Sequence, residues 1–298
     1  MKIANAPCSW GVLEFDLEGE VAGYVQVLDE MRQTGYAGTE LGDWGFMPTH
    51  PATLKKELKA RELSLLGAFV PVALVNLQAH TEGEAAALRT ARLLVDVAGN
   101  TPFIVLADDN GAVHLRTKHA GRVQPEHELS PDGWKVFADG VNRIAQAVRA
   151  RAGLRTVFHH HCAGYVETPA EVETLMRLTD PVIVGLCFDT GHYRFGGGDP
   201  VEGLKEHADR IWHVHFKDCH SDVASQSRVQ EWNYFESVAN GVFCELGKGE
   251  VDFPAVITEL EKRDYDGWIV VEQDVLPGMG SPKESAQRNR DYLESIGL

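Results

Sequence analysis

Short apolar runs alternate with longer amphipathic stretches along this whole chain, and few folds accommodate such a pattern. The short runs predict strands at Lys2–Pro7, Gly38–Leu41, Ser64–Val70, Pro102–Ala107, Arg155–His160, Val184–Asp189, Ile211–Phe216 and Gly267–Glu272. The stretches between them carry apolar residues at helical spacing, for example Trp134, Phe137, Val141, Ile144 and Val148. Eight strand–helix repeats predict a parallel sheet with crossover helices that closes into a (β/α)₈ TIM barrel.

The chain length agrees with one barrel. A length of 298 residues is normal for a single barrel with insertions, so we expect one domain over residues 1–298. The alternative is a doubly wound open sheet, which would require a glycine-rich phosphate loop after the first strand, and Gly11 alone does not supply one. At the start of one predicted helix, Thr168 followed by Glu171 predicts a capping box.

Composition excludes several classes of partner. The formal net charge of −16 repels phosphate backbones, so we expect no nucleic-acid partner. No apolar run approaches the length of a membrane span and the N-terminus lacks signal-peptide features, so we expect a cytoplasmic protein without membrane contact. Five cysteines without a CxxC motif argue against a disulfide framework and for a reducing compartment.

Two longer segments interrupt the regular alternation. They span Asp108–Pro131 and Asp218–Gly249, and each follows the C-terminal end of a predicted strand. Active sites of barrels are built from loops at this end, and long loops in compact domains are often functional. A tolerated surface insertion is the alternative for each segment.

Histidines gather at the ends of three successive predicted strands. Eight of the 13 histidines lie between residues 159 and 220. Because side chains alternate along a strand, two sets share a face: His159 with His161, and His213 with His215 and Lys217. A single histidine on a strand is usually a structural residue, so the grouping carries the argument.

Carboxylates also end predicted strands, namely Glu40, Asp189 and Glu272. A charged group at the end of an apolar strand is costly unless it is paired or bound to a metal. Imidazoles combined with carboxylates form a ligand set for Mn, Co, Fe or Zn. We therefore predict a divalent metal site at the C-terminal mouth of the barrel. Trp10 either forms part of an aromatic wall for the substrate or belongs to the core, and the loop Gly247-Lys248-Gly249 is either a plain turn or a loop that approaches a ligand.

Several longer motifs are distinctive, namely FHHHCAGYVET, LCFDTGHYRFGGGD, IWHVHFKDCH, GKGEVDF and GWIVVEQD. Through these motifs the sequence resembles, over nearly its whole length, the xylose isomerase-like TIM barrel superfamily, which includes sugar phosphate isomerases and epimerases. Within the superfamily these motifs are most similar to those of the inosose dehydratases of inositol catabolism. The chain departs from that pattern at Lys248, where an acidic residue is common, and at Glu167, where glutamine is expected.

The resemblance implies a metal held by His159, Asp189, His215 and Glu272. The superfamily usually has a glutamate on the fifth strand, where this chain has His159, with His161 as the alternative ligand. Mn²⁺ or Co²⁺ is the expected ion, with Zn²⁺, Fe²⁺ and Mg²⁺ as further candidates.

The resemblance also implies an enzyme acting on a small polyhydroxy ketone through a metal-stabilised enolate. Loss of the β-hydroxyl would make it a dehydratase for an inosose-like cyclic ketone, and return of the proton elsewhere would make it a sugar isomerase or epimerase. Candidate catalytic residues are Glu40 and His161 for proton transfer and His192 and Lys217 for holding substrate oxygens. The alternative for Lys217 is an ion pair with Asp218 or another neighbouring carboxylate. Candidate substrate-binding residues are Trp10, His213 and Lys248. Whether such barrels pair into homo-oligomers is left open.

Overall fold

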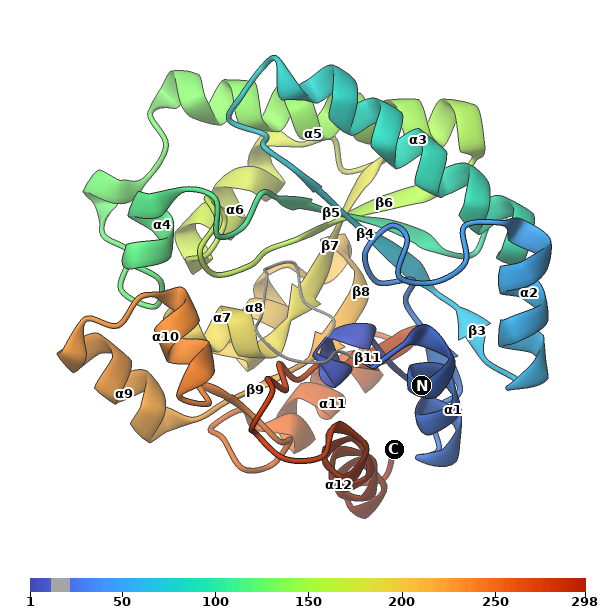
Figure 1. Cartoon of the computed structure of the whole chain (residues 1–298). Coiled ribbons are helices and arrows are strands. Elements are labelled where there is room, and N and C mark those ends of the chain that lie inside the picture. The colour runs from blue at the N-terminus through green and yellow to red at the C-terminus, as the bar shows by residue number, and fades with distance from the viewer. Residues whose placement is uncertain (12–21) are drawn as a thin grey trace.

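A single curled sheet forms the centre of the protein, whose computed structural model describes residues 1–11 and 22–298. Within these residues nine parallel strands make a nearly closed barrel with helices around it (Figure 1). In spatial order the strands are β3 (Ser64–Leu65), β2 (Gly38–Thr39), β1 (Lys2–Asn5), β11 (Trp268–Val271), β8 (Ile211–Phe216), β7 (Val184–Asp189), β6 (Arg155–His159), β5 (Phe103–Asp108) and β4 (Gly67–Val72).

Two features close the sheet. The first and last strands pair along their length, with Ala4 opposite Val270. The third predicted strand is divided into β3 and β4 at Leu66, whose N–H donates to Thr39 O at 3.0 Å and whose carbonyl accepts from Phe103 N at 2.8 Å. The chain thus passes from one neighbouring strand to the other without leaving the sheet. The barrel predicted from sequence is confirmed, with one strand in two pieces, and the open-sheet alternative is wrong.

Helices follow the strands and cover the barrel. The long helices α3 (Ala79–Ala98) and α5 (Pro131–Ala152) pack side by side at the top of Figure 1. The remaining major helices are α1 (Tyr24–Gln33), α2 (Pro51–Ala60), α6 (Pro169–Leu178), α7 (Thr190–Phe195), α8 (Pro200–Glu206), α11 (Phe253–Glu261) and α12 (Pro282–Ser295). The predicted capping box at the start of α6 is present, because Thr168 and Glu171 bond to each other's backbone N–H.

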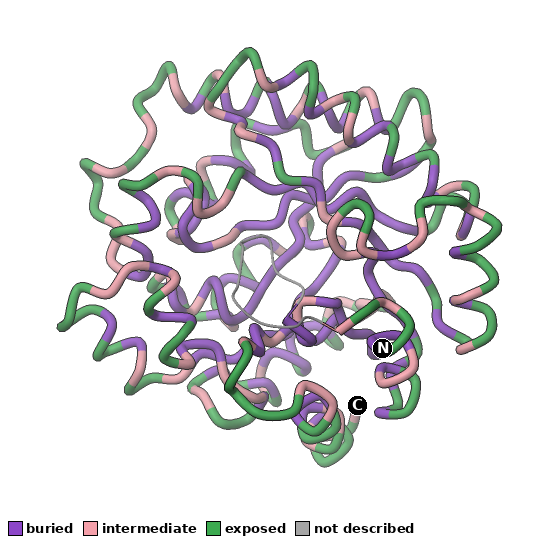
Figure 2. Tube along the Cα trace, in the orientation of Figure 1, coloured by how far each residue is buried: buried purple, intermediate pink, exposed green. Residues whose placement is uncertain are grey.

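Burial follows the expected pattern. The strands at the centre are buried and the outer faces of the helices are exposed, as Figure 2 shows. In α5 the apolar residues predicted to face inward are all buried, namely Trp134, Phe137, Val141, Ile144 and Val148. Among the described residues no helix has the length and apolarity needed to cross a bilayer.

The two long segments fold at the same end of the barrel and contact each other. The first contains α4 (His114–Lys118) and a 3₁₀ turn at Pro125–His127. The second contains a small antiparallel pair, β9 (Asp218–Cys219) and β10 (Phe243–Cys244), around α9 (Ser221–Gln230) and α10 (Tyr234–Ala239). Arg122 of the first segment donates to Trp232 O at 2.6 Å in the second, which ties the two together.

A buried ion pair anchors the first segment to the barrel. Arg116 of α4 and Glu171 of α6 are both fully buried and meet in two parallel hydrogen bonds of 2.8 Å. The Arg116 Nε–H also donates to Gly164 O at 2.7 Å. Without the Glu171 carboxylate, some of the five guanidinium N–H groups would have no acceptor. Removal of Glu171 therefore leaves the buried charge of Arg116 unpaired.

We expect Glu171→Ala to lower the free energy of unfolding by about 3–5 kcal/mol, because breaking a buried pair strands one charge in the interior. Urea denaturation followed by circular dichroism measures the change. Glu202→Ala is the matched control, since Glu202 pairs with Lys205 on the surface and its loss should change stability little. Equal effects of the two substitutions would contradict the anchoring role.

Candidate active site

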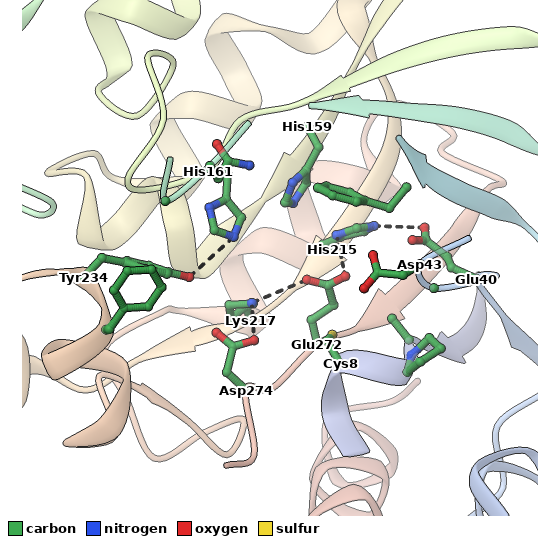
Figure 3. A pocket seen from close by; sticks show the side chains of 17 residues that line it. Cys8, Glu40, Asp43, His159, His161, His215, Lys217, Tyr234, Glu272 and Asp274 are labelled. Carbon is green, nitrogen blue, oxygen red and sulfur yellow. Dashed lines mark hydrogen bonds and ion pairs between the residues drawn. The ribbon is translucent and has the colours of Figure 1, made fainter. Parts of the chain in front are cut away.

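A pocket lies at the C-terminal ends of the barrel strands (Figure 3). Its lining comes from the strand ends, from the turn after β1 and from both long segments, and comprises Ala6, Pro7, Cys8, Glu40, Gly42, Asp43, Phe69, Asn110, Gly111, His159, His161, His215, Lys217, Tyr234, Phe235, Glu272 and Asp274. Four of these residues carry carboxylates, whereas Lys217 is the one Lys or Arg among them. The pocket therefore favours a cation.

Four donor atoms converge below this pocket. His159, Asp189, His215 and Glu272 each offer one nitrogen or oxygen, and these atoms lie within 4.8 Å of one another. The four residues come from the ends of β6, β7, β8 and β11, which are adjacent strands of the sheet. Parallel strands that end at one rim thus bring together residues that are far apart in sequence.

Most of these donor atoms have no hydrogen bond among the described residues. Both ring nitrogens of His159, Oδ2 of Asp189 and Nδ1 of His215 are buried without a hydrogen-bond partner. The nearest charged neighbours are the donors themselves, with His215 Nδ1 at 3.2 Å from Glu272 Oε1 and His159 Nε2 at 3.7 Å from Asp189 Oδ2. Buried polar atoms without partners are costly, and a bound cation would satisfy one nitrogen of each imidazole and Oδ2 of Asp189.

Neighbouring groups orient the donors. Glu40 Oε1 accepts from His215 Nε2 at 3.0 Å and from His213 Nε2 at 2.6 Å. Since a carboxylate only accepts, His215 carries a proton on Nε2 and turns Nδ1 toward the other donors. Likewise, Asp189 Oδ1 accepts from the backbone N–H of His192 at 2.8 Å, which leaves Oδ2 facing the cluster.

These contacts decide which group of residues suits a divalent metal ion. Glu40, His213 and His215 also lie close enough to hold an ion, but the contacting atoms of that group already bond to one another. Burial acts to raise the pKa of Glu40, but the imidazoles of His215 and His213 lower it to about 2. In the set His159, Asp189, His215 and Glu272, by contrast, the facing atoms of the first three residues have no hydrogen-bond partner among the described residues, so this set forms a site suited to a divalent metal.

His161 stands beside this site with a defined tautomer. Its Nδ1 lies 2.5 Å from the carbonyl of Cys162, which can only accept, so Nδ1 carries the proton. The neutral ring then has a lone pair on Nε2, which lies 3.4 Å from the hydroxyl of Tyr234. Burial is the main cause that lowers the pKa of His161 to about 3, so the ring is neutral.

His192 lies behind His161 rather than in the pocket. Its ring is fully buried and packs on the His161 ring with centroids 3.8 Å apart. Its Nδ1 accepts from the backbone N–H of Cys162 at 3.4 Å. The geometry fits support of His161 better than contact with substrate.

Lys217 reaches the pocket as a buried ammonium group. Its Nζ lies 3.1 Å from Asp274 Oδ1, 3.4 Å from Glu272 Oε2 and 4.9 Å from the centre of the Phe243 ring. It does not pair with its neighbour Asp218. That carboxylate instead accepts backbone N–H groups of the glycine-rich loop, from Gly247 and Gly249 among others.

Three predicted substrate-binding residues are not brought into the pocket. Trp10 is buried and its indole N–H donates to Glu30 at 2.7 Å. His213 lies deeper in the barrel and bonds to Glu40. Lys248 is on the surface, where it pairs with Glu245. The backbone of its loop donates hydrogen bonds to Asp218, which leaves the Lys248 side chain outside the pocket. Their positions give no support for substrate contact.

Several residues of the pocket do not follow from the sequence patterns. Asp274 lies two residues after Glu272, so strand-like alternation is a signal that points to it. Tyr234 lies within the long segment Asp218–Gly249, whose length indicates function without pointing to a particular residue. Asn110 lies in the long segment Asp108–Pro131 and Asp43 in the connection between β2 and α2, and neither residue has a local signal.

Comparison with known proteins adds to this geometry. Residues 28–296 match the family model described as xylose isomerase-like TIM barrel. The chain is 33% identical to the inosose dehydratase of Geobacillus kaustophilus over 298 residues, covering 99% of this chain and 94% of that protein. Among solved structures, the probable 3-DHS dehydratase AsbF of Bacillus anthracis superposes with a TM-score of 0.73 at 17% identity and 99% coverage of both chains. The IolI protein with a bound zinc atom gives a TM-score of 0.71 at 15% identity, covering 99% of this chain and 98% of that one.

We expect Glu272→Gln to lose the bound metal while the barrel stays folded, because an amide donates hydrogen bonds on one side and carries no charge for the cation. Metal content by mass spectrometry and folding by circular dichroism measure both parts. Glu245→Gln is the control, since Glu245 pairs with Lys248 and Arg288 outside the pocket. Full metal stoichiometry in Glu272→Gln would overturn the ligand assignment.

Glu40→Gln should weaken metal affinity by roughly 10–100-fold without abolishing binding, as is typical when the partner of a metal-binding histidine is removed. The neutral amide oxygen accepts from the imidazoles more weakly than the carboxylate does, so His215 is held less firmly in its tautomer. Competition with a fluorescent chelator measures the affinity. An unchanged dissociation constant would show that Glu40 does not orient His215.

Proposed function

Because the chain belongs to the xylose isomerase-like TIM barrel family, we propose that it is a divalent-metal-dependent dehydratase acting on an inosose-like cyclic polyhydroxy ketone. The observation that carries the proposal is the convergence of four buried donor atoms beneath a pocket that also holds a neutral imidazole and an ammonium group. The identity to an inosose dehydratase along almost the full length of both chains supports the substrate class.

We assign the metal to His159, Asp189, His215 and Glu272. A divalent ion held there supplies Lewis-acid stabilisation for negative charge that develops on the substrate's carbonyl oxygen. Two imidazoles with two carboxylates suit borderline transition metals, and we propose Mn²⁺ or Co²⁺. The same site bound by Zn²⁺ is the nearest alternative, and metal titration distinguishes the ions.

We assign the removal of the proton next to the carbonyl to His161. Its Nε2 lone pair faces the pocket, and the Cys162 carbonyl and the His192 ring hold the imidazole in place. A general base must lie within hydrogen-bond reach of the proton that it takes, and His161 lines the space above the metal site. Glu40 is then an orienting group for His215 and not a base.

Lys217 is assigned to a substrate oxygen. Asp274 and Glu272 hold its ammonium group at the pocket surface, where a third N–H remains to donate to a ligand. The carboxylate of Asp43, which also lines the pocket, is placed to accept from hydroxyl groups of a polyol. A cyclic polyol with a ketone therefore meets donors, acceptors and a cation.

The cysteines of the described residues are free, which fits a reducing compartment such as the cytoplasm.

The direct test is an assay on scyllo-inosose that follows the ultraviolet absorbance of an enolised dione product. We expect activity that a chelator abolishes and that added Mn²⁺ or Co²⁺ restores. The enzyme loaded with each ion in turn gives the preference. No signal from folded, metal-loaded protein would overturn the dehydratase proposal, and a panel of ketohexoses and ketopentoses would then test isomerisation and epimerisation.

A further inference from the structure

Dehydration requires a second proton transfer that the residues assigned so far do not provide. After the proton next to the carbonyl is removed, the β-hydroxyl must leave, and hydroxide is a poor leaving group unless a donor protonates it. Lys217 is an unsuitable donor because its ammonium group is held by Asp274 and Glu272. The carboxylate of Glu40 already accepts from two imidazoles.

Tyr234 places a hydroxyl group at the required position. It begins α10 in the second long segment, is 2% exposed, and lines the pocket beside His161 (Figure 3). Its hydroxyl oxygen lies 3.4 Å from His161 Nε2, and the two rings meet edge to face with centroids 5.5 Å apart. The hydroxyl is therefore next to the atom that we assign as the base.

The tautomer of His161 sets the direction of this contact. Because Nδ1 donates to Cys162 O, Nε2 has the lone pair and the Tyr234 O–H is the donor. At 3.4 Å this bond is long and therefore weak. Once Nε2 has taken a proton, it becomes the donor and the Tyr234 oxygen the acceptor.

The position of Tyr234 is determined by its helix. Asn233 caps α10 by accepting from the N–H of Glu236 at 3.0 Å, and Glu236 accepts from the N–H of Asn233 at 2.7 Å. Ser237 of α10 and Ser227 of α9 share a buried hydrogen bond of 2.7 Å. The ring is thus held by packing and helix capping, as a catalytic group must be.

We propose that Tyr234 is the catalytic proton donor to the departing β-hydroxyl, an inference that rests on the dehydratase function proposed above. The substrate's C–H proton moves to His161 Nε2 and its electron pair forms the enolate. The enolate electrons then form the C=C bond as the β C–O bond breaks, and the leaving oxygen takes the proton of the Tyr234 hydroxyl and departs as water. The Nε2–H of His161 finally returns its proton to the Tyr234 oxygen, so one water is released and both residues are regenerated.

Tyr234→Phe tests the proposal, since it keeps the ring and removes only the hydroxyl. With metal-loaded enzyme and scyllo-inosose in D₂O, proton NMR measures two events separately: exchange of the proton next to the carbonyl, and formation of the dione. We expect Tyr234→Phe to retain exchange but to lose dione formation by about 10²–10⁴-fold, the usual contribution of a general acid. Retained exchange would also show that the variant is folded around an intact base.

Tyr36→Phe is the matched control, because it removes another buried tyrosine hydroxyl, which donates to Ala286 O at 2.9 Å away from the pocket. It should change neither event. Dione formation at the wild-type rate in Tyr234→Phe would overturn the proposal, as would loss of both exchange and dehydration, which would assign Tyr234 to holding His161. If wild-type enzyme showed neither event, the dehydratase function itself would be wrong and the role of Tyr234 with it.

Discussion

Buried lone pairs without hydrogen-bond partners are the constraint on which the site depends. The C-terminal ends of β6, β7, β8 and β11 bring side-chain nitrogen and oxygen atoms within 4.8 Å of one another. Burying such atoms unpaired would cost several times the net value of a hydrogen bond. A divalent cation removes this penalty, and the barrel supplies the rigid frame that keeps the donors converged.

The groups around the donors have the same purpose. Glu40 fixes the proton of His215 on the nitrogen that faces away from the cluster, and the N–H of His192 occupies one oxygen of Asp189. In each residue one polar atom makes this contact, and the other polar atom is left to face the ion. The proposed ligands are therefore oriented before a metal binds, and such orientation by neighbouring groups strengthens metal affinity.

Local periodicity explains what could be predicted from the sequence, whereas positions in the connecting segments follow no such rule. Alternation along a strand is a backbone property, so the residue pattern alone places His159 and Glu272 at inward-facing strand ends, and barrel closure brings those ends to one rim. Lys248 was expected at the substrate, but the carboxylate of Asp218 binds the backbone of its loop and leaves the side chain on the surface. Tyr234 reaches the pocket only because α10 packs at the barrel mouth, which depends on contacts between distant segments.

This division between strands and segments bears on which reaction a barrel of this kind performs. The residues to which we assign metal binding and proton removal lie at strand ends, and these two steps serve isomerisation and elimination equally. Elimination differs only in needing a proton donor near the leaving oxygen. In this chain that donor is assigned to Tyr234 in the segment after β8, which Arg122 ties to the segment after β5. Reaction type can therefore change through these two segments while the metal site beneath them stays the same.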